Sequence, residues 1–510
     1  MRSIGMDKVE QIRDEVLAVV CSRSMTHEQK IAALAHKSGS LLDVLDLPEG
    51  LQSLKEKGII CDLNEGPAPF RPRYIVPDYN LLLNKGCSFL RLDAPKDLYE
   101  ALNTLLIFYR HVPSITNYPV FIGNIDNLLE PFVIKTDQEL TKKMLRLFLI
   151  NIDRTITDSF CHANIGPKPS VTGEIILELE RELQNAVPNM TIKYDPALTG
   201  DVFAQKAALA QLVAAKPAFA NHNMFKAELG EGYGIVSCYN GLRTGGGAYT
   251  LVRVRLGRLA EEARDSKHFF SDILPSCLNV MAKYIDERIR FLVEKSGFFE
   301  SSFLSREGFI SRRNFSAMFG MVGLAECVNS LMSKDGLKGR YGHSEEADSL
   351  GVRIIEFMSN FTRNYENTYC EGFGGRFMLH GQVGIDTDEG ETPNVRIPIG
   401  EEPAELSDHI MHCAKFHKYF PSGIGEIFLV ESTALNNPES IVDIVKGAFA
   451  KGVRYLSFHD SNSDVIRVTG YLAKRSEMKK LSEGDNVLQN TTLFGLGAAN
   501  NSKILERKHR

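Results

Sequence analysis

The sequence has nine cysteines but no Cys-x-x-Cys pair. The usual ligand motifs of a zinc ribbon or of a cysteine-bound iron–sulfur cluster are therefore missing, and we expect no metal site in this chain. The cysteines are odd in number and widely spaced, which indicates a reducing compartment rather than a disulfide framework. They stand at positions 21, 61, 87, 161, 238, 277, 327, 370 and 413.

Long apolar runs and an excess of basic charge are also lacking. No stretch of roughly eighteen apolar residues occurs, so we expect no membrane-spanning helix. The polar residues 1–10 lack the apolar core of a signal peptide. The net charge is −5, whereas nucleic-acid binding calls for a basic face. These absences predict a cytoplasmic globular protein with neither a membrane nor a nucleic-acid partner.

The hydrophobic pattern predicts an α/β chain. In residues 1–115 apolar residues recur at helical spacing, and Thr26 with Gln29 forms a capping box. Further along, short strand patterns alternate with longer helical ones, which favours parallel strands joined by crossover helices. We expect strands at 119–122, 190–194, 233–237, 250–256, 426–430 and 454–458, helices at 138–153, 173–186, 202–215, 272–295, 314–332 and 440–451, and a long glycine-rich loop at 372–394.

One glycine near the C-terminus lies in the segment Arg467-Val-Thr-Gly-Tyr471. Loss of an α-hydrogen from glycine leaves a radical that spreads over the flanking amide and carbonyl groups, and no side chain hinders planarity or access. Glycine also accepts backbone angles that other residues resist. The alternative interpretation is a tight turn at the end of a strand.

Three further segments lie upstream in a fixed order, Pro188-Asn-Met-Thr191, Pro217-Ala-Phe-Ala-Asn-His222 and Ser237-Cys-Tyr-Asn240. With the glycine segment, this order resembles that of the glycyl radical enzymes, which have a PNLT strand, a G-x-P-x-F-x-N-D segment, an active-site cysteine and a radical glycine. The later Arg340-Tyr-Gly-His-Ser-Glu-Glu-Ala-Asp348 is similar to another segment of these enzymes. The resemblance extends from about position 119 to 477. It is closest to the YjjI-type glycine radical enzymes, which are related to pyruvate formate-lyase and the anaerobic ribonucleotide reductases.

The resemblance implies a fold as well as a chemistry. The expected fold is a ten-stranded α/β barrel of two antiparallel halves, each with five parallel strands, next to a helical N-terminal region. The implied regions are a mainly helical N-terminal region at 1–115, a barrel core with the cysteine loop at 116–420 and a C-terminal glycyl radical segment at 421–510. A homodimer is expected on the same grounds.

In the implied chemistry, Gly470 is the modified residue that stores the radical. Cys238 forms a thiyl that takes hydrogen from a small polar substrate. A separate radical S-adenosylmethionine activase with an iron–sulfur cluster installs the radical, so no tightly bound cofactor is expected in this chain. The resemblance also implies that the protein works under anaerobic conditions and that its activated form is sensitive to oxygen. For Cys238 the alternative is an ordinary buried thiol.

Several departures from the family pattern leave the reaction open between C–C or C–O bond chemistry and reduction. Asn240 stands where dehydratases of the family carry a glutamate, and Tyr239 stands where pyruvate formate-lyase has a second cysteine. Two alternatives remain: a ribonucleotide reductase-like enzyme without the zinc site, and a non-catalytic relative that keeps the barrel. Cys87 is a candidate second redox thiol.

Four residues are candidates for substrate binding. Asn240 adjoins the cysteine, and Arg243 with the glycines after it offers donors to an anionic group, although this stretch is equally a flexible hinge. His343 and Glu345 lie in the 340–348 segment, where the alternative is an exposed helix start. The histidines at 380, 409, 412 and 417 have the spacing of no recognised metal site, and we interpret them as ordinary surface or core residues.

Overall fold

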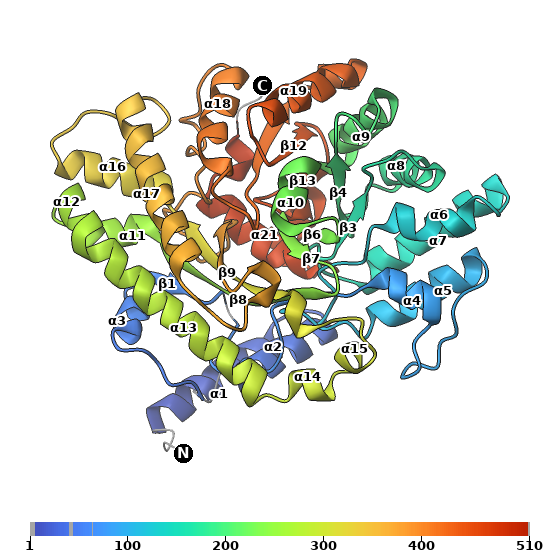
Figure 1. The fold of residues 1–510 in the computed structure, drawn as a ribbon, viewed down its shortest axis with the longest axis horizontal. Coiled ribbons are helices and arrows are strands. Elements are labelled where there is room, and N and C mark those ends of the chain that lie inside the picture. The colour runs from blue at the N-terminus through green and yellow to red at the C-terminus, as the bar shows by residue number, and fades with distance from the viewer. Residues whose placement is uncertain (1–5, 40–43, 64, 508–510) are drawn as a thin grey trace.

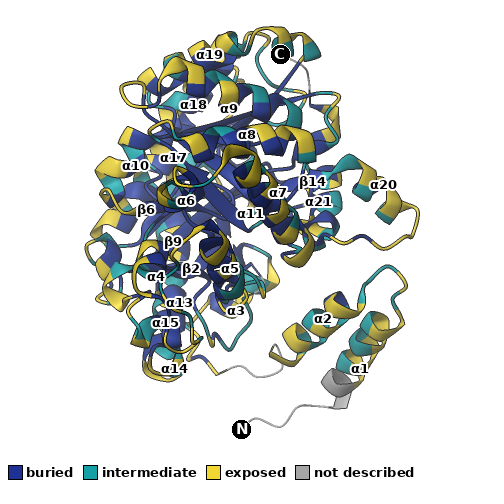
Figure 2. Ribbon diagram, turned by 90° about the vertical axis from the view of Figure 1, so that its right-hand side faces the viewer, coloured by how far each residue is buried: buried dark blue, intermediate teal, exposed yellow. Residues whose placement is uncertain are grey.

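The computed structural model describes residues 6–39, 44–63 and 65–507. Two five-stranded sheets lie at its centre, and helices cover their outer faces (Figure 1). The strands are almost wholly buried (Figure 2). No helix in the described ranges is long and apolar enough to cross a bilayer.

The first sheet has the strand order β11-β12-β5-β4-β3. Strands β3, β4 and β5 are parallel to one another, β12 is antiparallel to β5, and β11 is parallel to β12. Their bounds are β3 His162–Ile165, β4 Asn189–Tyr194, β5 Ala218–Asn221, β11 Glu426–Val430 and β12 Tyr455–Asp460.

The second sheet is built on the ten-residue strand β8, which is parallel to β9, as β9 is to β10. Two short strands from the N-terminal region, β1 and β2, pair with β8 in the antiparallel sense. The bounds are β1 Ile60–Cys61, β2 Tyr74–Val76, β8 Gly246–Arg255, β9 Phe315–Val322 and β10 Met378–Gly381.

The strand directions divide the two sheets into opposed sets. Antiparallel pairing occurs only where β5 meets β12 and where β1 and β2 meet β8, among the paired strands of these sheets. A parallel bridge between His380 and Gly423 links β10 to the segment that leads into β11. Strands β8 to β12 thus run one way and β3 to β5 the other. Two opposed halves of this kind are what the family resemblance predicts.

Many of the helices join successive parallel strands, because a parallel pair needs a crossover connection. Their bounds are α1 Met6–Cys21, α2 His27–Gly39, α3 Leu51–Glu56, α4 Tyr79–Lys85, α5 Leu98–Tyr109, α6 Ile125–Val133, α7 Gln138–Thr155, α8 Val171–Leu183, α9 Asp201–Ala214, α10 His222–Leu229, α11 Leu256–Glu261, α12 Ser266–His268, α13 Leu274–Glu294, α14 Phe298–Ser301, α15 Phe303–Arg306, α16 Leu324–Lys334, α17 Glu345–Asn364, α18 Leu406–His417, α19 Pro438–Ala450, α20 Arg475–Ser482 and α21 Asn490–Asn501.

The N-terminal pair α1–α2 stands clear of the barrel in Figure 2. The predicted capping box opens α2: the Gln29 side chain accepts from Thr26 N–H (2.9 Å), and Thr26 Oγ1 accepts from Gln29 N–H (3.3 Å). The Gln29 amide also donates to the Val487 carbonyl at 3.3 Å, which ties α2 to the C-terminal segment.

Three sequence-based assignments are wrong, those at 314–332, 372–394 and 119–122. The predicted helix at 314–332 is strand β9 followed by α16, with Gly323 in the left-handed region between them. An apolar run of this kind fits a buried strand and a buried helix equally well, because both are apolar on every side. The predicted loop at 372–394 contains β10, whose Gly381 packs against Ile424. Strands β3 and β5 were not predicted, while the expected strand at 119–122 contributes only single hydrogen bonds such as Ile122 N–H to His162 O (2.9 Å).

One buried ion pair fastens α8 to the turn that enters β5. Lys216 Nζ lies 2.8 Å from a Glu180 carboxylate oxygen, and both side chains are fully buried. Removing one partner leaves an uncompensated charge in the core, which is far more costly than removing both. We expect Lys216→Met to lower the free energy of unfolding by about 3 kcal/mol, whereas the double change Lys216→Met, Glu180→Leu recovers most of it. Thermal melting followed by circular dichroism compares the chains, and a double variant as unstable as the single one contradicts the prediction.

Candidate active site

Cys238 lies at the tip of a β-hairpin. Strands β6 (Tyr233–Val236) and β7 (Asn240–Arg243) pair as far as Val236 and Asn240, so Ser237, Cys238 and Tyr239 form the turn. Ser237 has a φ of 56°, in the left-handed region that a residue with a side chain rarely adopts. This turn places the thiol in the interior, where Cys238 is buried.

Gly470 lies at the tip of a second hairpin. Strands β13 (Val465–Arg467) and β14 (Leu472–Lys474) pair as far as Arg467 and Leu472, and Val468 N–H donates to Tyr471 O at 2.9 Å to close the turn. Gly470 is buried too. Two hairpins from distant parts of the chain therefore end in the same buried region.

The two tips are in direct contact. A Cβ atom placed on Gly470 would lie 3.1 Å from Cys238 Sγ and 2.7 Å from Cys238 Cβ, and 2.5 Å from Val383 Cγ1. The backbone of Gly470 does not lie in the left-handed region, so its φ does not demand glycine. The lack of a side chain is needed because any Cβ would collide with the facing cysteine. The hydrogen that Gly470 carries in that direction faces Val383 and the Cys238 side chain, including its sulfur.

Arg467 and Asn189 hold the glycine tip in place. Arg467 Nη1 and Asn189 Nδ2 both donate to the Gly470 carbonyl, at 2.9 Å and 3.1 Å. The Asn189 amide also donates to the Ser237 carbonyl at 3.1 Å, so one side chain joins the two hairpins. Arg467 is fully buried and further bonded to the Asn189 side-chain oxygen (2.9 Å) and the Ala215 carbonyl (3.0 Å).

The cysteine tip has its own supports. His162 Nδ1 lies 2.7 Å from the Ser237 carbonyl, which can only accept, so Nδ1 carries the proton and Nε2 accepts from the Thr191 hydroxyl (2.7 Å). Burial lowers the pKa of His162 to about 3, and the ring is neutral at physiological pH. Tyr455 donates its hydroxyl to the Cys238 carbonyl at 3.3 Å.

The thiol stays protonated. Burial raises the pKa of Cys238 to about 12, against smaller opposing effects of the Ser237 hydroxyl and of the Arg467 and Arg73 charges. A thiolate would be the form for nucleophilic attack. The neutral S–H bond found here is instead the form that can give up a hydrogen atom.

Sequence reasoning missed several buried polar residues in the interior of the fold, of which Arg73 acts on the thiol through its charge. The charge of Arg73 lowers the pKa of both Cys238 and His380, although burial is the larger cause for His380, whose pKa is about 3. Arg73 Nε, Asn240 Oδ1 and Gln382 Oε1 are buried and have no hydrogen-bond partner in the described part of the chain. No sequence signal marks Arg73 or Gln382, because their burial and their effects on Cys238 and His380 arise only in the folded chain.

The four sequence candidates for substrate binding divide into two pairs. Asn240 is buried directly after the cysteine turn, and the half-buried Arg243 ends β7 opposite Tyr233. His343 and Glu345 are both exposed, His343 just before the N-cap residue of α17 and Glu345 in the first turn of that helix. Within the described residues, neither has a hydrogen bond or ion pair to either hairpin. Cys87 is paired through its backbone with Leu92, and the Glu307 charge contributes to the raised pKa of its thiol after the larger effect of burial.

One cluster has the composition of a metal site. The donor atoms of His409, Cys413 and Glu426 all lie within 4.8 Å of one another and are buried. The Arg396 guanidinium, however, sits 3.2 Å from the Glu426 carboxylate and already balances its charge. Burial also raises the pKa of the Cys413 thiol, whereas metal binding requires a thiolate. We therefore keep the interpretation of these histidines as core residues.

Comparison with solved structures defines the class of fold. The chain superposes with a TM-score of 0.71 on hydroxyproline dehydratase from Clostridioides difficile with trans-4-hydroxy-L-proline bound (12% identity, 98% of this chain and 88% of that one). It also superposes with a TM-score of 0.71 on the B12-independent glycerol dehydratase of Clostridium butyricum (11%, 99% and 89%). For the anaerobic ribonucleotide reductase of Thermotoga maritima with dATP and CTP the TM-score is 0.69 (14%, 94% and 100%). The α/β fold is that of the glycyl radical enzymes, as predicted, and identities this low show the fold alone.

The chain belongs to the YjjI-like glycyl radical enzyme family, whose model "Glycyl radical enzyme YjjI-like" matches residues 25–510. A Haemophilus influenzae relative described as an uncharacterized protein is 44% identical over 502 residues, 97% of each chain. The uncharacterized protein YjjI of Escherichia coli K12 is 41% identical and covers 96% of this chain and 95% of its own length. The family inferred from the sequence motifs is confirmed.

The close contact between the two hairpin tips predicts how a side chain at position 470 would affect stability. We expect Gly470→Ala to destabilise the protein by about 2 kcal/mol, because overpacking forces the tips apart. The added change Val383→Ala, which removes the nearest atom, is expected to recover part of the loss. The matched control is Gly447→Ala in α19, where no atom lies within 4 Å of the new Cβ, and we expect it to be neutral or stabilising by up to about 1 kcal/mol. Thermal melting compares the three variants with the native chain. A Gly447→Ala variant that is destabilised as much as Gly470→Ala would contradict the prediction.

Proposed function

We propose that this protein is an oxygen-sensitive glycyl radical enzyme in which Gly470 stores the radical and Cys238 forms the thiyl that abstracts hydrogen from a small polar substrate. The observation that carries the proposal is the contact of the two hairpin tips, with Cys238 Sγ 3.1 Å from the side-chain position of Gly470. A hydrogen atom can pass between these two groups without any rearrangement, because both are already held in place.

The proposed reaction is a chain of hydrogen transfers. An activase removes one hydrogen atom from the α-carbon of Gly470. The glycyl radical then takes the thiol hydrogen of Cys238, which restores the glycine and leaves a thiyl. The thiyl removes a hydrogen atom from the substrate, and the product radical recovers one from the thiol. Each transfer is close to thermoneutral, so the contribution of the protein is positioning and the exclusion of competing reactants.

The activase is proposed to be a separate radical S-adenosylmethionine enzyme that carries the iron–sulfur cluster. Gly470 is buried behind Val383 and the cysteine hairpin. A second protein therefore reaches its α-hydrogen only after the 465–474 hairpin has moved out of the barrel. The proposal thus includes an open state of the C-terminal segment.

The substrate is proposed to lie on the side of Cys238 that faces Arg73, His380 and Gln382. Buried polar atoms without partners are costly unless a ligand or water satisfies them. Asn240 and Arg243 belong to the same proposed wall, whereas His343 and Glu345 are too exposed on α17 to support a role in it. An amide at position 240 cannot take up a proton at neutral pH. Proton removal by a carboxylate at that position is therefore not part of the proposed chemistry.

Two experiments distinguish the two alternative functions from the proposed one. For a ribonucleotide reductase-like enzyme, nucleotides are the substrates, and a panel of nucleotides under argon should raise the melting temperature. Our proposal expects nucleotides to raise it no more than inorganic phosphate at the same concentration does. For a non-catalytic relative, a competent activase should produce no radical at all.

The radical itself is the direct test. After anaerobic activation we expect a doublet in the electron paramagnetic resonance spectrum, split by the remaining α-hydrogen of Gly470 and collapsing to a singlet in protein that contains α-deuterated glycine. Cys238→Ser should keep the doublet and lose turnover, because the store forms without the thiyl. A doublet that survives in Gly470→Ala would show that another residue holds the radical.

Exposure to air gives an independent readout. Oxygen is expected to cleave the activated chain at Gly470 and to release a C-terminal fragment of about forty residues. Gly470→Ala should stay whole after the same treatment, and so should native protein that was never activated. Mass spectrometry of the fragment fixes the site, and cleavage elsewhere would count against Gly470.

A further inference from the structure

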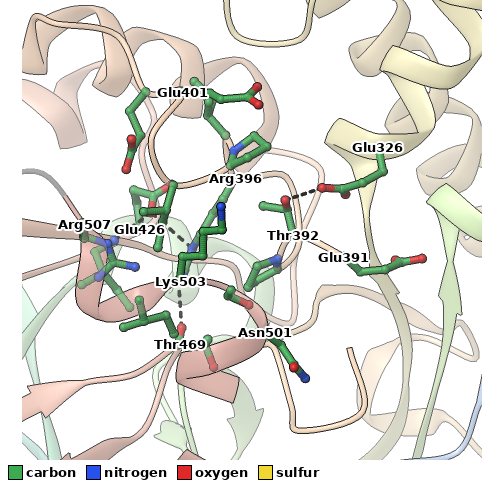
Figure 3. Close-up of a pocket in the computed structure, with 18 of the residues that line it drawn as sticks. Glu326, Glu391, Thr392, Arg396, Glu401, Glu426, Thr469, Asn501, Lys503 and Arg507 are labelled. Atoms are coloured by element: carbon green, nitrogen blue, oxygen red, sulfur yellow. Dashed lines mark hydrogen bonds and ion pairs between the residues drawn. The ribbon is translucent and has the colours of Figure 1, made fainter. Parts of the chain in front are cut away.

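A cavity of about 230 Å³ lies between the C-terminal segment and the barrel. Figure 3 shows Arg507 and Glu426 at one end and Glu326 and Glu391 at the other, with Arg396 between them. The cavity is lined also by Thr469, the neighbour of Gly470 in the chain. It therefore spans the boundary that must open if Gly470 is to become accessible.

Arg396 connects the barrel to the glycine hairpin. Its Nη2 donates to the Gly425 carbonyl at 2.8 Å and to the Thr469 carbonyl at 2.9 Å, and its Nε lies 3.2 Å from Glu426. The side chain is only 5% exposed. Its remaining nitrogen, Nη1, is buried and has no hydrogen-bond partner in the described ranges.

Arg507 supplies a second guanidinium from the opposite side. It follows the 3-10 turn Ile504–Glu506 at the end of the C-terminal segment and is 9% exposed. Burial, and after it the charge of Arg396, lowers the pKa of Arg507 to about 10, so the group stays charged at neutral pH. Its Nη1 is likewise buried and without a partner in the described part of the chain.

The carboxylates of the cavity wall are engaged elsewhere. Glu426 is balanced by Arg396, and the pKa of Glu391 is raised to about 7, chiefly by burial. The acidic residues also have partners of their own, although Glu326 Oε2 and Glu391 Oε2 are buried and have no hydrogen-bond partner among the described residues. The pairs are Glu391 with Arg255, Glu401 with Arg340, Glu326 with Thr392 and Glu402 with the Gly400 amide.

We propose that this cavity binds a small oxyanion, the phosphate or carboxylate group of a metabolite, between Arg396 and Arg507, and that the bound anion holds the glycine hairpin closed. Each guanidinium offers the N–H groups of one unpartnered nitrogen, Nη1, and charged N–H donors of this kind bind the oxygens of phosphate and carboxylate. Arg507 belongs to the C-terminal segment and Arg396 to the barrel, so the anion bridges the two. A ligand that binds only the closed state shifts the population toward it.

The role in regulation rests on the proposed function, because it matters only if a separate activase must reach Gly470. Linkage makes the effect reciprocal: the anion opposes opening, and opening by the activase releases the anion. The binding itself does not depend on any radical. Non-activated protein and a Cys238→Ser chain are therefore expected to bind the anion equally well, so a failure of the radical chemistry would leave the anion site standing.

Binding is tested by isothermal titration calorimetry with inorganic phosphate in one arm and succinate in another, against sodium chloride of the same ionic strength. We expect saturable binding of at least one oxyanion, and the stronger of the two identifies the recognised group. Arg507→Gln should weaken it at least tenfold, whereas Arg313→Gln, which removes an exposed arginine outside the cavity, should not change it. Absence of binding beyond the chloride control, or unchanged binding in Arg507→Gln, overturns the site.

The closing effect is tested by amide hydrogen exchange of residues 465–474, read by mass spectrometry. A saturating concentration of the better anion should slow exchange at least threefold in the native chain and leave it unchanged in Arg507→Gln. If the anion binds and the exchange of the hairpin does not slow, the regulatory part of the proposal is wrong.

Discussion

The site depends on one carbonyl group and the two side chains that bind it. Arg467 and Asn189 both donate to the Gly470 oxygen, and Asn189 also donates to the Ser237 carbonyl of the facing turn. These bonds fix the distance between a glycine and a cysteine 232 positions apart (470 minus 238). Charge-assisted bonds in a buried setting are stronger than neutral ones. The barrel serves largely to deliver these few groups to one point.

The groups around Cys238 are not suited to acid–base catalysis. The His162 ring is neutral, the Cys238 thiol is held in its protonated form, and the same burial causes both shifts. A nucleophilic cysteine would be accompanied by a nearby base or cation that lowers its pKa. The surroundings of Cys238 act in the opposite sense overall, which suits a group whose hydrogen leaves as an atom.

The motifs in the sequence anticipated the centre of the site better than its surroundings. Asn189 and Arg467 both fall inside the quoted segments, yet their shared bond to Gly470 could not be read from the sequence, because it depends on how β4 faces the second hairpin. Arg73 and Gln382 carry no motif, and their burial and electrostatic effects follow only from the folded chain. The error at 314–332 has a similar cause, since a strand that is buried on both faces loses the alternation that marks a strand. Of the two reasons given for glycine at 470, the structure supports the lack of a side chain, since any Cβ would meet Cys238 and Val383, and not the backbone angle.

In the proposed function, a buried radical store sets two demands that conflict. Burial protects the radical, but it also hides the α-hydrogen from the protein that must remove it. These demands meet at the boundary between the barrel and the C-terminal segment around Thr469, and the packing of this boundary is not the most stable one. Arg396 and Arg507 each leave a buried nitrogen without a partner in the described chain, at a cost of about 1–3 kcal/mol apiece. A boundary of this kind is easier to open than a sealed apolar one, and it becomes harder to open once an anion fills it. The stability lost at this boundary is therefore what allows the glycine hairpin to open and an anion to keep it closed.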